Sequence, residues 1–363
     1  MKKILFCIDS LKPGGAEIIM CNTVNELVKD SNLDITVQLL QKEQKLDLDE
    51  KVKVNTFMNN NIFYRRIIKW MPASILHKFI IQEKYDYEIA FMEGASTKVI
   101  SGCHNKKTKT YAWIHTDMEK YRWSQRSYRS VKEEKRAYSN IDKIFAVSSD
   151  TRDIFEKKYN KPATYVQNIL NDKKINICAD KEKNIYDDHH QFHIVSVGSI
   201  KPIKGYERLI KVHKALKNEG VKCVHYILGD GPSYADLKQK ITENDLEDRI
   251  ILKGYIENPY PWIKEADMLA CVSYAEGYSS VVCEAVILGV PVITTECSGM
   301  KDILGDSEYG LIVKNDDISI INGIKKMVTN KEFYQKYLLK VKERRTEFSV
   351  DNAVKQLKTK LEI

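Results

Sequence analysis

The 363-residue sequence has no long hydrophobic run. A helix that spans a bilayer needs about 20 consecutive apolar residues, and no apolar stretch of this chain approaches that length. The sequence begins with the basic "MKK", but the short apolar run "ILFCI" that follows predicts a first strand and not a signal peptide. We therefore expect a cytoplasmic protein that is soluble or peripheral on the inner face of the cell membrane.

Metal-binding and disulfide patterns are also missing. The eight cysteines are scattered without a CxxC pair, and a chain of this length needs no disulfide framework, which predicts free thiols in a reducing compartment. No DxD-type pair of carboxylates stands in a suitable context. The sequence therefore predicts neither a bound metal nor a cofactor in its chemistry.

Internal repeats, low-complexity tracts and nucleic-acid-binding modules are absent as well. The glycine-rich turn "GDGPSY" at 229–234 lacks the third glycine and the distant acid of a dinucleotide-binding fingerprint. Positive charge without a recognised binding module does not indicate nucleic acid as a partner.

Positive charge is concentrated in the first half of the chain. Residues 1–190 contain 33 Lys and Arg against 26 Asp and Glu, whereas the remainder contains 25 against 24. Much of the excess lies in 64–84 and 120–136. The first of these stretches and its flank mix Arg65, Arg66, Lys69 and Lys78 with Phe63, Trp70, Phe79 and Ile80. This composition fits an interfacial helix on anionic lipid, or a solvated basic face over an ordinary core.

Short apolar strands alternate with helical segments in two successive series. The predicted strands are 4–8, 35–40, 87–92, 110–114, 143–147 and 164–167, followed by 193–198, 223–228, 249–254, 267–272, 291–295 and 310–313. Two such series predict an α/β chain with two Rossmann-like, doubly wound parallel-sheet domains that face each other across a cleft.

The domain boundaries follow from the same pattern. We predict a first domain over 1–170, a polar linker over 171–191, a second domain over 192–342, and a C-terminal helical segment over 343–363 that packs back on the first domain.

The stretch "AEGYSSVVCEAVILGVPVITTECSG" (275–299) carries two acids around a helix start. Ser279 or Ser280 is the expected N-cap, and Gly289 and Pro291 end the helix before a strand. Glu276 then lies on the loop and Glu284 about one turn inside the helix. The free N–H groups between them suit a phosphate. Acid, phosphate cradle and acid match a sugar, a diphosphate and a ribose laid end to end, although a solvated loop glutamate and a solvated helix glutamate would look the same.

Each strand of the second series is followed by a loop with polar or glycine-rich residues. The ordered set "VGSIKPIKGYERLI", "LGDGP", "LKGYI" and "EGYSSVVCEAVILGVPVITTECSG", with "GGAE" at 14–17, resembles the family 4 (group 1) retaining glycosyltransferases, and the resemblance runs nearly end to end. It implies the GT-B architecture.

The resemblance also implies roles for single residues. Glu276 would hold hydroxyls of the donor sugar, Glu284 the ribose, Lys204 the diphosphate, and His115 of "AWIHTD" the donor sugar. The implied catalytic residues are His115, Glu276 and Lys204. The implied donor-binding residues are Gly14, Gly15, Ser199, Lys201, Lys204, Tyr255, Ile256, Glu276, Gly277, Tyr278, Ser279, Ser280 and Glu284.

One position departs from the family pattern. The family usually has an arginine five residues before the lysine, and here that position is Ser199. A serine only hydrogen-bonds, whereas Lys201, two residues on, could substitute for the cation; the alternatives are a different donor, a cation from the other domain, or reduced activity.

Taken together, these observations predict a metal-independent, retaining transfer of a hexose from a nucleotide-diphosphate sugar, with UDP-sugar favoured. The expected acceptor is a glycan or a glycan on a lipid carrier, in capsule or other surface polysaccharide synthesis. A non-catalytic nucleotide-sugar-binding partner of a transferase is the alternative. A sugar phosphorylase fits less well because the sequence nominates no cofactor lysine.

Overall fold

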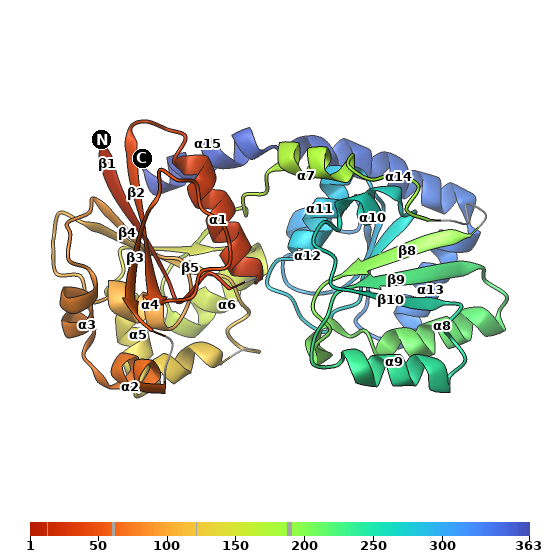
Figure 1. Cartoon of the computed structure of the whole chain (residues 1–363), viewed down its shortest axis with the longest axis horizontal. Helices are drawn as coiled ribbons and strands as arrows, with labels where there is room; N and C mark the ends of the chain where they lie inside the picture. The colour runs from red at the N-terminus through yellow and green to blue at the C-terminus, as the bar shows by residue number, and fades with distance from the viewer. Residues whose placement is uncertain (13, 60–61, 121, 187–190) are drawn as a thin grey trace. The chain divides into compact units, whose positions relative to one another are not determined.

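The computed structural model describes residues 1–12, 14–59, 62–120, 122–186 and 191–363. The chain divides into two compact units (Figure 1). Unit 1 comprises Met1–Leu170 and Ala353–Ile363, and unit 2 comprises Asn171–Asn352.

Unit 1 is built on a seven-stranded parallel sheet with the strand order β3-β2-β1-β4-β5-β6-β7. Its strands are β1 (Lys2–Ile8), β2 (Leu33–Gln41), β3 (Lys53–Met58), β4 (Tyr87–Ala90), β5 (Lys109–Ile114), β6 (Lys143–Ala146) and β7 (Thr164–Tyr165). Its helices are α1 (Gly15–Leu27), α2 (Ile62–Trp70), α3 (Ala73–Ile80), α4 (Ala95–Ile100), α5 (Val131–Ser139), α6 (Ser149–Tyr159), α15 (Val350–Leu361) and the 3-10 turn η1 (Trp123–Ser127).

Unit 2 is built on a six-stranded parallel sheet with the order β10-β9-β8-β11-β12-β13. Its strands are β8 (Phe192–Val197), β9 (Cys223–Leu228), β10 (Ile250–Gly254), β11 (Met268–Cys271), β12 (Val292–Thr295) and β13 (Leu311–Val313). Its helices are α7 (Asp172–Ala179), α8 (Arg208–Asn218), α9 (Tyr234–Glu243), α10 (Tyr260–Glu265), α11 (Ser280–Leu288), α12 (Met300–Leu304), α13 (Asp317–Thr329) and α14 (Lys331–Arg344), with the 3-10 turns η2 (Pro202–Lys204) and η3 (Arg345–Glu347).

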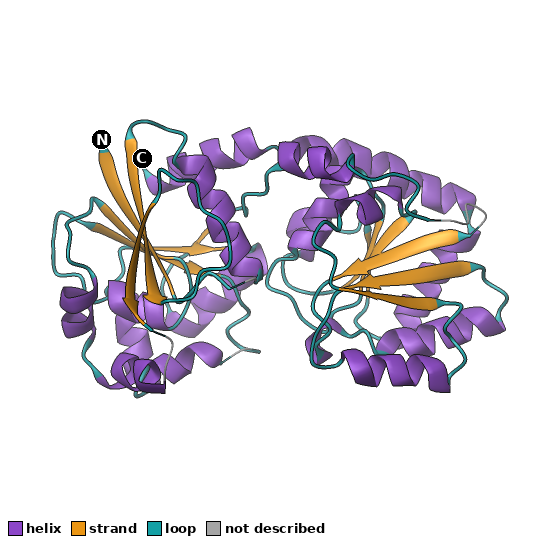
Figure 2. Ribbon diagram, viewed as in Figure 1, coloured by secondary structure: helices purple, strands orange, loops and turns teal. Residues whose placement is uncertain are grey.

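Both sheets are covered by helices on their two faces (Figure 2). This explains why the central strands read as continuous apolar runs, with Ile4 to Ile8 of β1 fully buried. The strand order in each sheet reverses direction next to the first strand of the unit, between β1 and β4 and between β8 and β11. The prediction of two Rossmann-like parallel sheets is confirmed, and in such sheets ligands bind beyond the carboxyl ends of the strands.

Two elements differ from the sequence prediction. Strand β3 was not predicted, because it is an edge strand whose first four residues are exposed and which therefore lacks an apolar run. Within the predicted linker, residues 172–179 form helix α7, which Asn171 caps and which buries Ile175 and Ala179 against α10 and α11. Two apolar residues one turn apart are too weak a pattern to reveal this helix from sequence.

The C-terminal helix α15 packs against unit 1. Leu357 and Leu361 of α15 are buried. The Tyr87 hydroxyl donates to the Glu362 carbonyl at 2.8 Å, and Lys143 Nζ donates to the Lys360 carbonyl at 2.7 Å. Helix α15 therefore packs at the amino ends of the unit 1 strands.

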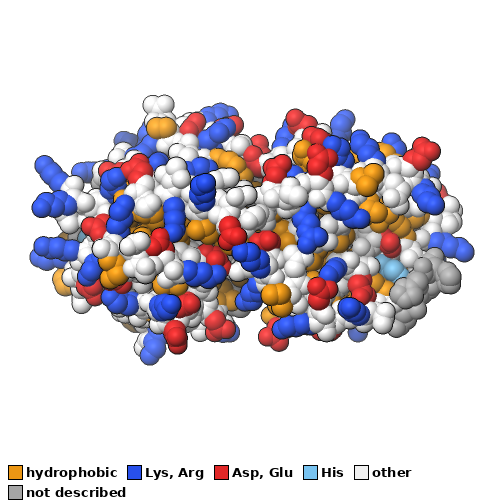
Figure 3. Space-filling model, turned by 90° about the horizontal axis from the view of Figure 1, so that it is seen from above, with side chains coloured by type: hydrophobic (Ala, Val, Ile, Leu, Met, Phe, Trp, Pro, Cys, Tyr) orange, Lys and Arg blue, Asp and Glu red, His pale blue; other side chains and the backbone are white. Residues whose placement is uncertain are grey.

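In the ranges that the structure describes, no helix is both long and apolar enough to cross a bilayer. Lysine and arginine side chains are spread over the surface and mixed with acidic ones, and they gather at the left end of the space-filling view, which unit 1 forms (Figure 3).

Candidate active site

The two-acid segment of unit 2 has the predicted local structure. Helix α11 begins at Ser280 after the N-cap residue Ser279 and ends at Gly289, which is left-handed with φ 75° and ψ 27°. The Ser279 side chain makes no capping hydrogen bond within the described chain. Glu276 therefore lies on the loop between β11 and α11, and Glu284 lies about one turn inside the helix, at the carboxyl edge of the sheet.

Glu276 contacts two side chains from the same edge. Lys204 Nζ donates to Glu276 Oε1 at 2.7 Å, and Ser273 Oγ donates to the same oxygen at 2.6 Å. The side chains of Lys204 and Glu276 are 26% and 12% exposed. Neither contact uses Oε2, so the carboxylate keeps an acceptor for another ligand while its charge is partly balanced.

Lys204 reaches Glu276 because its loop packs tightly on the end of β11. Gly205 is left-handed with φ 67°, and a Cβ at this position would lie 2.4 Å from the Val272 carbonyl oxygen. Only glycine allows this approach. In the described part of the chain, no hydrogen bond or ion pair joins Glu276 to Ser199 or to the exposed Lys201.

The loops after β9 and β10 lie at the same edge. A Cβ at Gly229 would lie 2.0 Å from the Gly198 carbonyl oxygen, so the loops after β8 and β9 touch through their backbones. Tyr255 and Ile256 follow β10, and Tyr255 is 73% exposed. Gly277, Tyr278 and Ser280, on the loop and first turn before Glu284, are half-buried.

Glu284 differs from Glu276 in its surroundings. It is half-buried on α11, and its carboxylate forms no hydrogen bond or ion pair among the residues that the structure describes. Burial raises its pKa to about 7. Burial, and then the charge of Glu284, raise the pKa of the Tyr260 phenol, which shows that α10 lies close by. A carboxyl group of this kind can exchange hydrogen bonds with a ligand hydroxyl in either protonation state.

A buried arginine supports the Glu276 loop, and the sequence analysis did not find it. Arg208 of α8 donates to Asp317 Oδ1 at 2.9 Å and to Asn315 Oδ1 at 2.6 Å. Asn315 Nδ2 in turn donates to the Tyr274 carbonyl at 3.0 Å. Glu276 lies two residues after Tyr274, so these hydrogen bonds fix the backbone of the Glu276 loop. The arginine follows a glycine-rich loop, but no local signal pairs it with residues over a hundred positions away.

In unit 1, His115 directly follows β5 and is buried. Burial lowers the pKa of its imidazole to about 3, although a hydrogen bond to the Phe91 backbone opposes this effect. The Nε2 atom has no hydrogen-bond partner in the described chain, and the ring lies 4.9 Å from the ring of Phe91 between centroids. His115 is therefore neutral near pH 7 and keeps one unused hydrogen-bonding atom.

Glu93 fixes the backbone beside His115. Its Oε1 accepts the N–H groups of His115 at 2.7 Å and of Thr116 at 2.8 Å, while Oε2 has no partner in the described ranges. Burial raises the pKa of the Glu93 carboxyl, and these hydrogen bonds oppose the rise.

Asp9, just after β1, lies at the same carboxyl edge of unit 1. Burial raises its pKa to about 7, helped by the nearby charge of Glu17. A cavity of about 170 Å³ beside it is also lined by Gln41, by Arg65 of α2 and by Arg126. Sequence reasoning missed both Asp9 and Glu93, although an acid within three residues of a strand's carboxyl end is the available signal.

The predicted glycines of unit 1 are at the start of α1. Gly14 is the N-cap residue and Gly15 the first helical residue. A Cβ at Gly14 would lie 2.3 Å from a Glu17 carboxylate oxygen, whereas nothing lies within 4 Å of one at Gly15. Gly15 therefore leaves open space at this helix start. Of the predicted site residues, Gly14, Gly15 and His115 belong to unit 1, and the others to unit 2.

Sequence comparisons find similar proteins among the glycosyltransferases. Residues 179–344 match the family model described as "Glycosyl transferases group 1". The Campylobacter jejuni "N-acetylgalactosamine-N,N'-diacetylbacillosaminyl-diphospho-undecaprenol 4-alpha-N-acetylgalactosaminyltransferase" is 33% identical over 157 residues, which cover 43% of this chain and 42% of that protein. A second Campylobacter jejuni protein, named as an alpha-1,4-N-acetyl-D-galactosaminyltransferase of a "PP-undecaprenol" glycan, is 23% identical, with 97% of this chain and 96% of that protein covered.

Solved structures show the same fold over the whole chain. HepE of Anabaena, solved in complex with UDP and glucose, has a TM-score of 0.78 at 17% identity, with all of both chains covered. The lipopolysaccharide outer core galactosyltransferase WaaB in its apo form has a TM-score of 0.73 at 16% identity, with 98% of each chain covered. The chain thus has the GT-B fold, and its residues 179–344 are similar to the group 1 glycosyltransferases.

Proposed function

We propose that the chain is a retaining, metal-independent hexosyltransferase that uses a UDP-sugar and extends a glycan on a lipid carrier in surface polysaccharide synthesis. The observation that carries this proposal is the contact between Lys204 and Glu276, 2.7 Å apart at the carboxyl edge of the unit 2 sheet. A cation and an acid side by side at the ends of parallel strands can bind the phosphate and the sugar hydroxyls of one ligand.

The proposed mechanism follows from where charge develops. When the sugar–phosphate bond breaks, the nucleotide diphosphate leaves with the bonding electron pair and the sugar becomes oxocarbenium-like. Lys204 and the first N–H groups of α11 are fixed positive groups that would stabilise the departing diphosphate. Glu276 Oε2 would accept sugar hydroxyls, and Glu284 would bind the ribose.

Retention of configuration rests on resemblance to the family, with the acceptor attacking on the face of the leaving group. We assign no side-chain nucleophile. His115 suits a hydrogen bond to a donor hydroxyl better than an acid–base role, because its lowered pKa keeps it neutral.

Independence from metal is proposed because protein groups supply positive charge at the diphosphate. Turnover is expected to continue after a brief treatment with EDTA. Loss of turnover that magnesium or manganese restores would contradict this part of the proposal.

The lipid-linked acceptor is supported by the names of the Campylobacter jejuni relatives and by unit 1. Helices α2 and α3 bury Tyr64, Ile68, Leu76 and Ile80, and expose Phe63, Trp70 and Phe79 by 62 to 64%. Phe63, Arg66 and Trp70 follow one another at spacings of three and four, so they share the outward face of α2. Large aromatic rings among exposed cations are the composition of a helix that lies in a membrane interface.

Membrane binding is tested by cosedimentation with anionic and neutral liposomes at low and physiological salt. Wild type should bind anionic liposomes, and a variant with Arg65, Arg66, Lys69 and Lys78 changed to glutamine should bind less, because each cation near an anionic surface contributes about 1 kcal/mol. A matched control changes the exposed unit 2 lysines Lys222, Lys238, Lys331 and Lys336 to glutamine. An equal loss of liposome binding in both variants would indicate a nonspecific effect of charge and would favour a soluble acceptor.

The transfer itself is tested without an acceptor. Radiolabelled UDP-sugars should be hydrolysed slowly to free sugar and UDP, and the same ligands should raise the melting temperature. Ligand at a hundred times its Kd stabilises a protein by about 2.7 kcal/mol. Stabilisation without release for every sugar tested would favour the alternative, a non-catalytic partner subunit, for which Ser199 in place of a cation is the supporting observation.

A further inference from the structure

Three potential metal ligands meet in unit 1, at the opposite end of the strands from His115. They are the imidazole of His77 on α3, the carboxylate of Glu88 in β4 and the thiol of Cys103 after α4, and their ligand atoms all lie within 4.8 Å of one another. His77 Nε2 and Glu88 Oε2 are 2.7 Å apart. We propose that these three side chains form a zinc site.

The ligand set selects the metal. Zinc takes thiolate sulfur at about 2.3 Å and imidazole nitrogen or carboxylate oxygen at about 2.0–2.2 Å, usually in tetrahedral geometry. Calcium and magnesium prefer sites made of oxygen atoms. Tetrahedral ligands at these bond lengths lie about 3.3–3.7 Å apart, so the 2.7 Å pair must open, and the other separations, all within 4.8 Å, must close by at most about 1 Å.

The surrounding fold holds the three ligands in place. A Cβ at Gly102 would lie 2.1 Å from the Ala73 carbonyl oxygen, so the turn that carries Cys103 is pressed against the start of α3, the helix that carries His77. Glu88 is almost fully buried within the sheet, where it pairs in register with Thr110 of β5. Three segments that are distant in sequence are thereby fixed next to one another.

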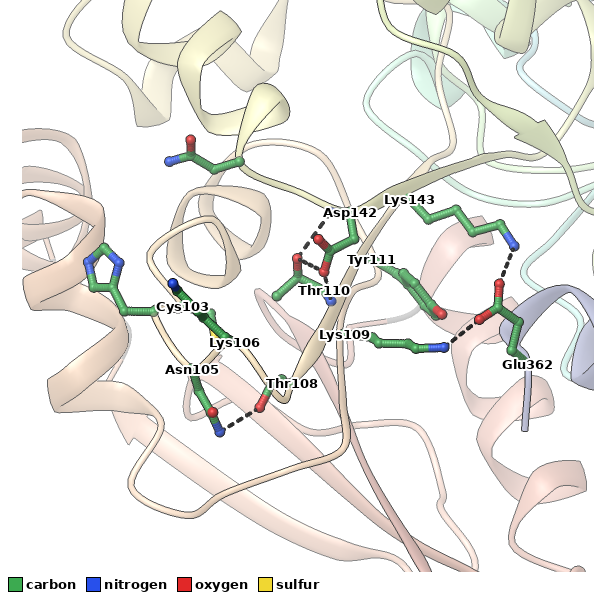
Figure 4. Close-up of a pocket in the computed structure, with 12 residues that line it drawn as sticks. Cys103, Asn105, Lys106, Thr108, Lys109, Thr110, Tyr111, Asp142, Lys143 and Glu362 are labelled. Carbon is green, nitrogen blue, oxygen red and sulfur yellow. Dashed lines mark hydrogen bonds and ion pairs between the residues drawn. The ribbon is translucent and has the colours of Figure 1, made fainter.

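A neighbouring pocket would give a metal ion and a water ligand access to the site. Cys103 lines a pocket of about 700 Å³ (Figure 4). Figure 4 shows Cys103 on the opposite side of this pocket from Glu362, toward which Lys109 and Lys143 point. Both lysines are ion-paired with Glu362, so their charge is partly neutralised on that side. A water from the pocket would complete the fourth position, as in zinc sites with three protein ligands.

The metal would act on stability and not on the proposed sugar transfer. His115 lies five residues beyond Thr110 along β5, which corresponds to about 16 Å. The bound ion would tie α3, β4 and the α4–β5 turn together, and α3 carries the exposed Phe79 and Lys78 of the proposed membrane face.

The test measures metal on the full chain. After treatment with chelator and dialysis, we expect about one zinc ion per chain to rebind, and cobalt to give a thiolate charge-transfer absorption. Cys103→Ser should weaken zinc binding at least tenfold and abolish the cobalt absorption. Cys178→Ser, which changes a similarly half-buried thiol in unit 2, should change neither.

A second measurement uses the unmodified chain and so does not depend on the folding of a variant. Zinc should slow alkylation of Cys103 by iodoacetamide, read by peptide mass spectrometry, and should leave the alkylation rate of Cys178 unchanged. Equal alkylation of Cys103 with and without zinc, or an unchanged cobalt spectrum in Cys103→Ser, would overturn the proposal.

Discussion

The carboxyl edges of the two sheets present different chemistry. In unit 2, the edge carries the paired charges of Lys204 and Glu276, beside Glu284, which has no partner among the described residues. In unit 1, it carries buried groups with polar atoms that have no hydrogen-bond partner in the described ranges, such as His115 Nε2 and Glu93 Oε2, and the pKa values of both side chains are shifted toward the uncharged forms. Fixed charge suits a diphosphate, whereas neutral hydrogen-bonding groups suit sugar hydroxyls.

The largest effect on activity is expected from the acids at the carboxyl edge of the unit 2 sheet. Glu276→Ala should lower kcat about 100- to 1,000-fold, as loss of one group that stabilises the transition state commonly does. Glu284→Ala should instead raise KM, because ribose contacts persist in the ground and transition states. Steady-state kinetics measure both, with exposed Glu257→Ala as the control. Small and equal effects would remove the support for two acids with separate roles.

A smaller effect on activity is expected from His115, at the carboxyl edge of the unit 1 sheet. His115→Phe keeps an aromatic ring against Phe91 but removes Nε2, so it should lower kcat/KM about tenfold, the value of roughly one hydrogen bond. Because burial already lowers the pKa of His115 to about 3, the ratio of wild type to variant should not change between about pH 6 and pH 9. A ratio that follows an ionisation in this range would mean that His115 acts as a charged group. Exposed His104→Phe is the control.

The smallest expected effect concerns stability. Burial raises the pKa of Glu284 from 4.5 to about 7, so the folded chain binds this proton more tightly than the unfolded chain. Stability from this group is therefore present at low pH and is lost as the pH rises through about 7. Glu284→Gln should be more stable than wild type near pH 8, on the order of 1–3 kcal/mol, and equal to it near pH 4. Thermal unfolding across this pH range checks the sign, and a variant less stable at both pH values would contradict it.

The two units also differ in how many of their site residues could be predicted from the sequence. Motifs in unit 2 are local, since Glu276 and Glu284 flank one helix start and Lys204 follows the adjacent strand, so the fold and these positions could be predicted. Arg208 with Asp317, and His77 with Glu88 and Cys103, are brought together only by tertiary packing. Single polar residues such as Asp9 and Glu93 have no spacing pattern, and their burial appears only in the folded chain.

The most direct test of the proposed donor site is a double-mutant cycle between Lys204 and Glu276. UDP release from the best UDP-sugar would be measured for wild type, Lys204→Ala, Glu276→Ala and the double variant. Because the two groups are 2.7 Å apart and would bind one ligand, the double variant should be little slower than the slower single variant, with a coupling energy of about 1–3 kcal/mol. Independent, additive losses, or UDP release that neither substitution changes, would contradict a donor site built on this pair.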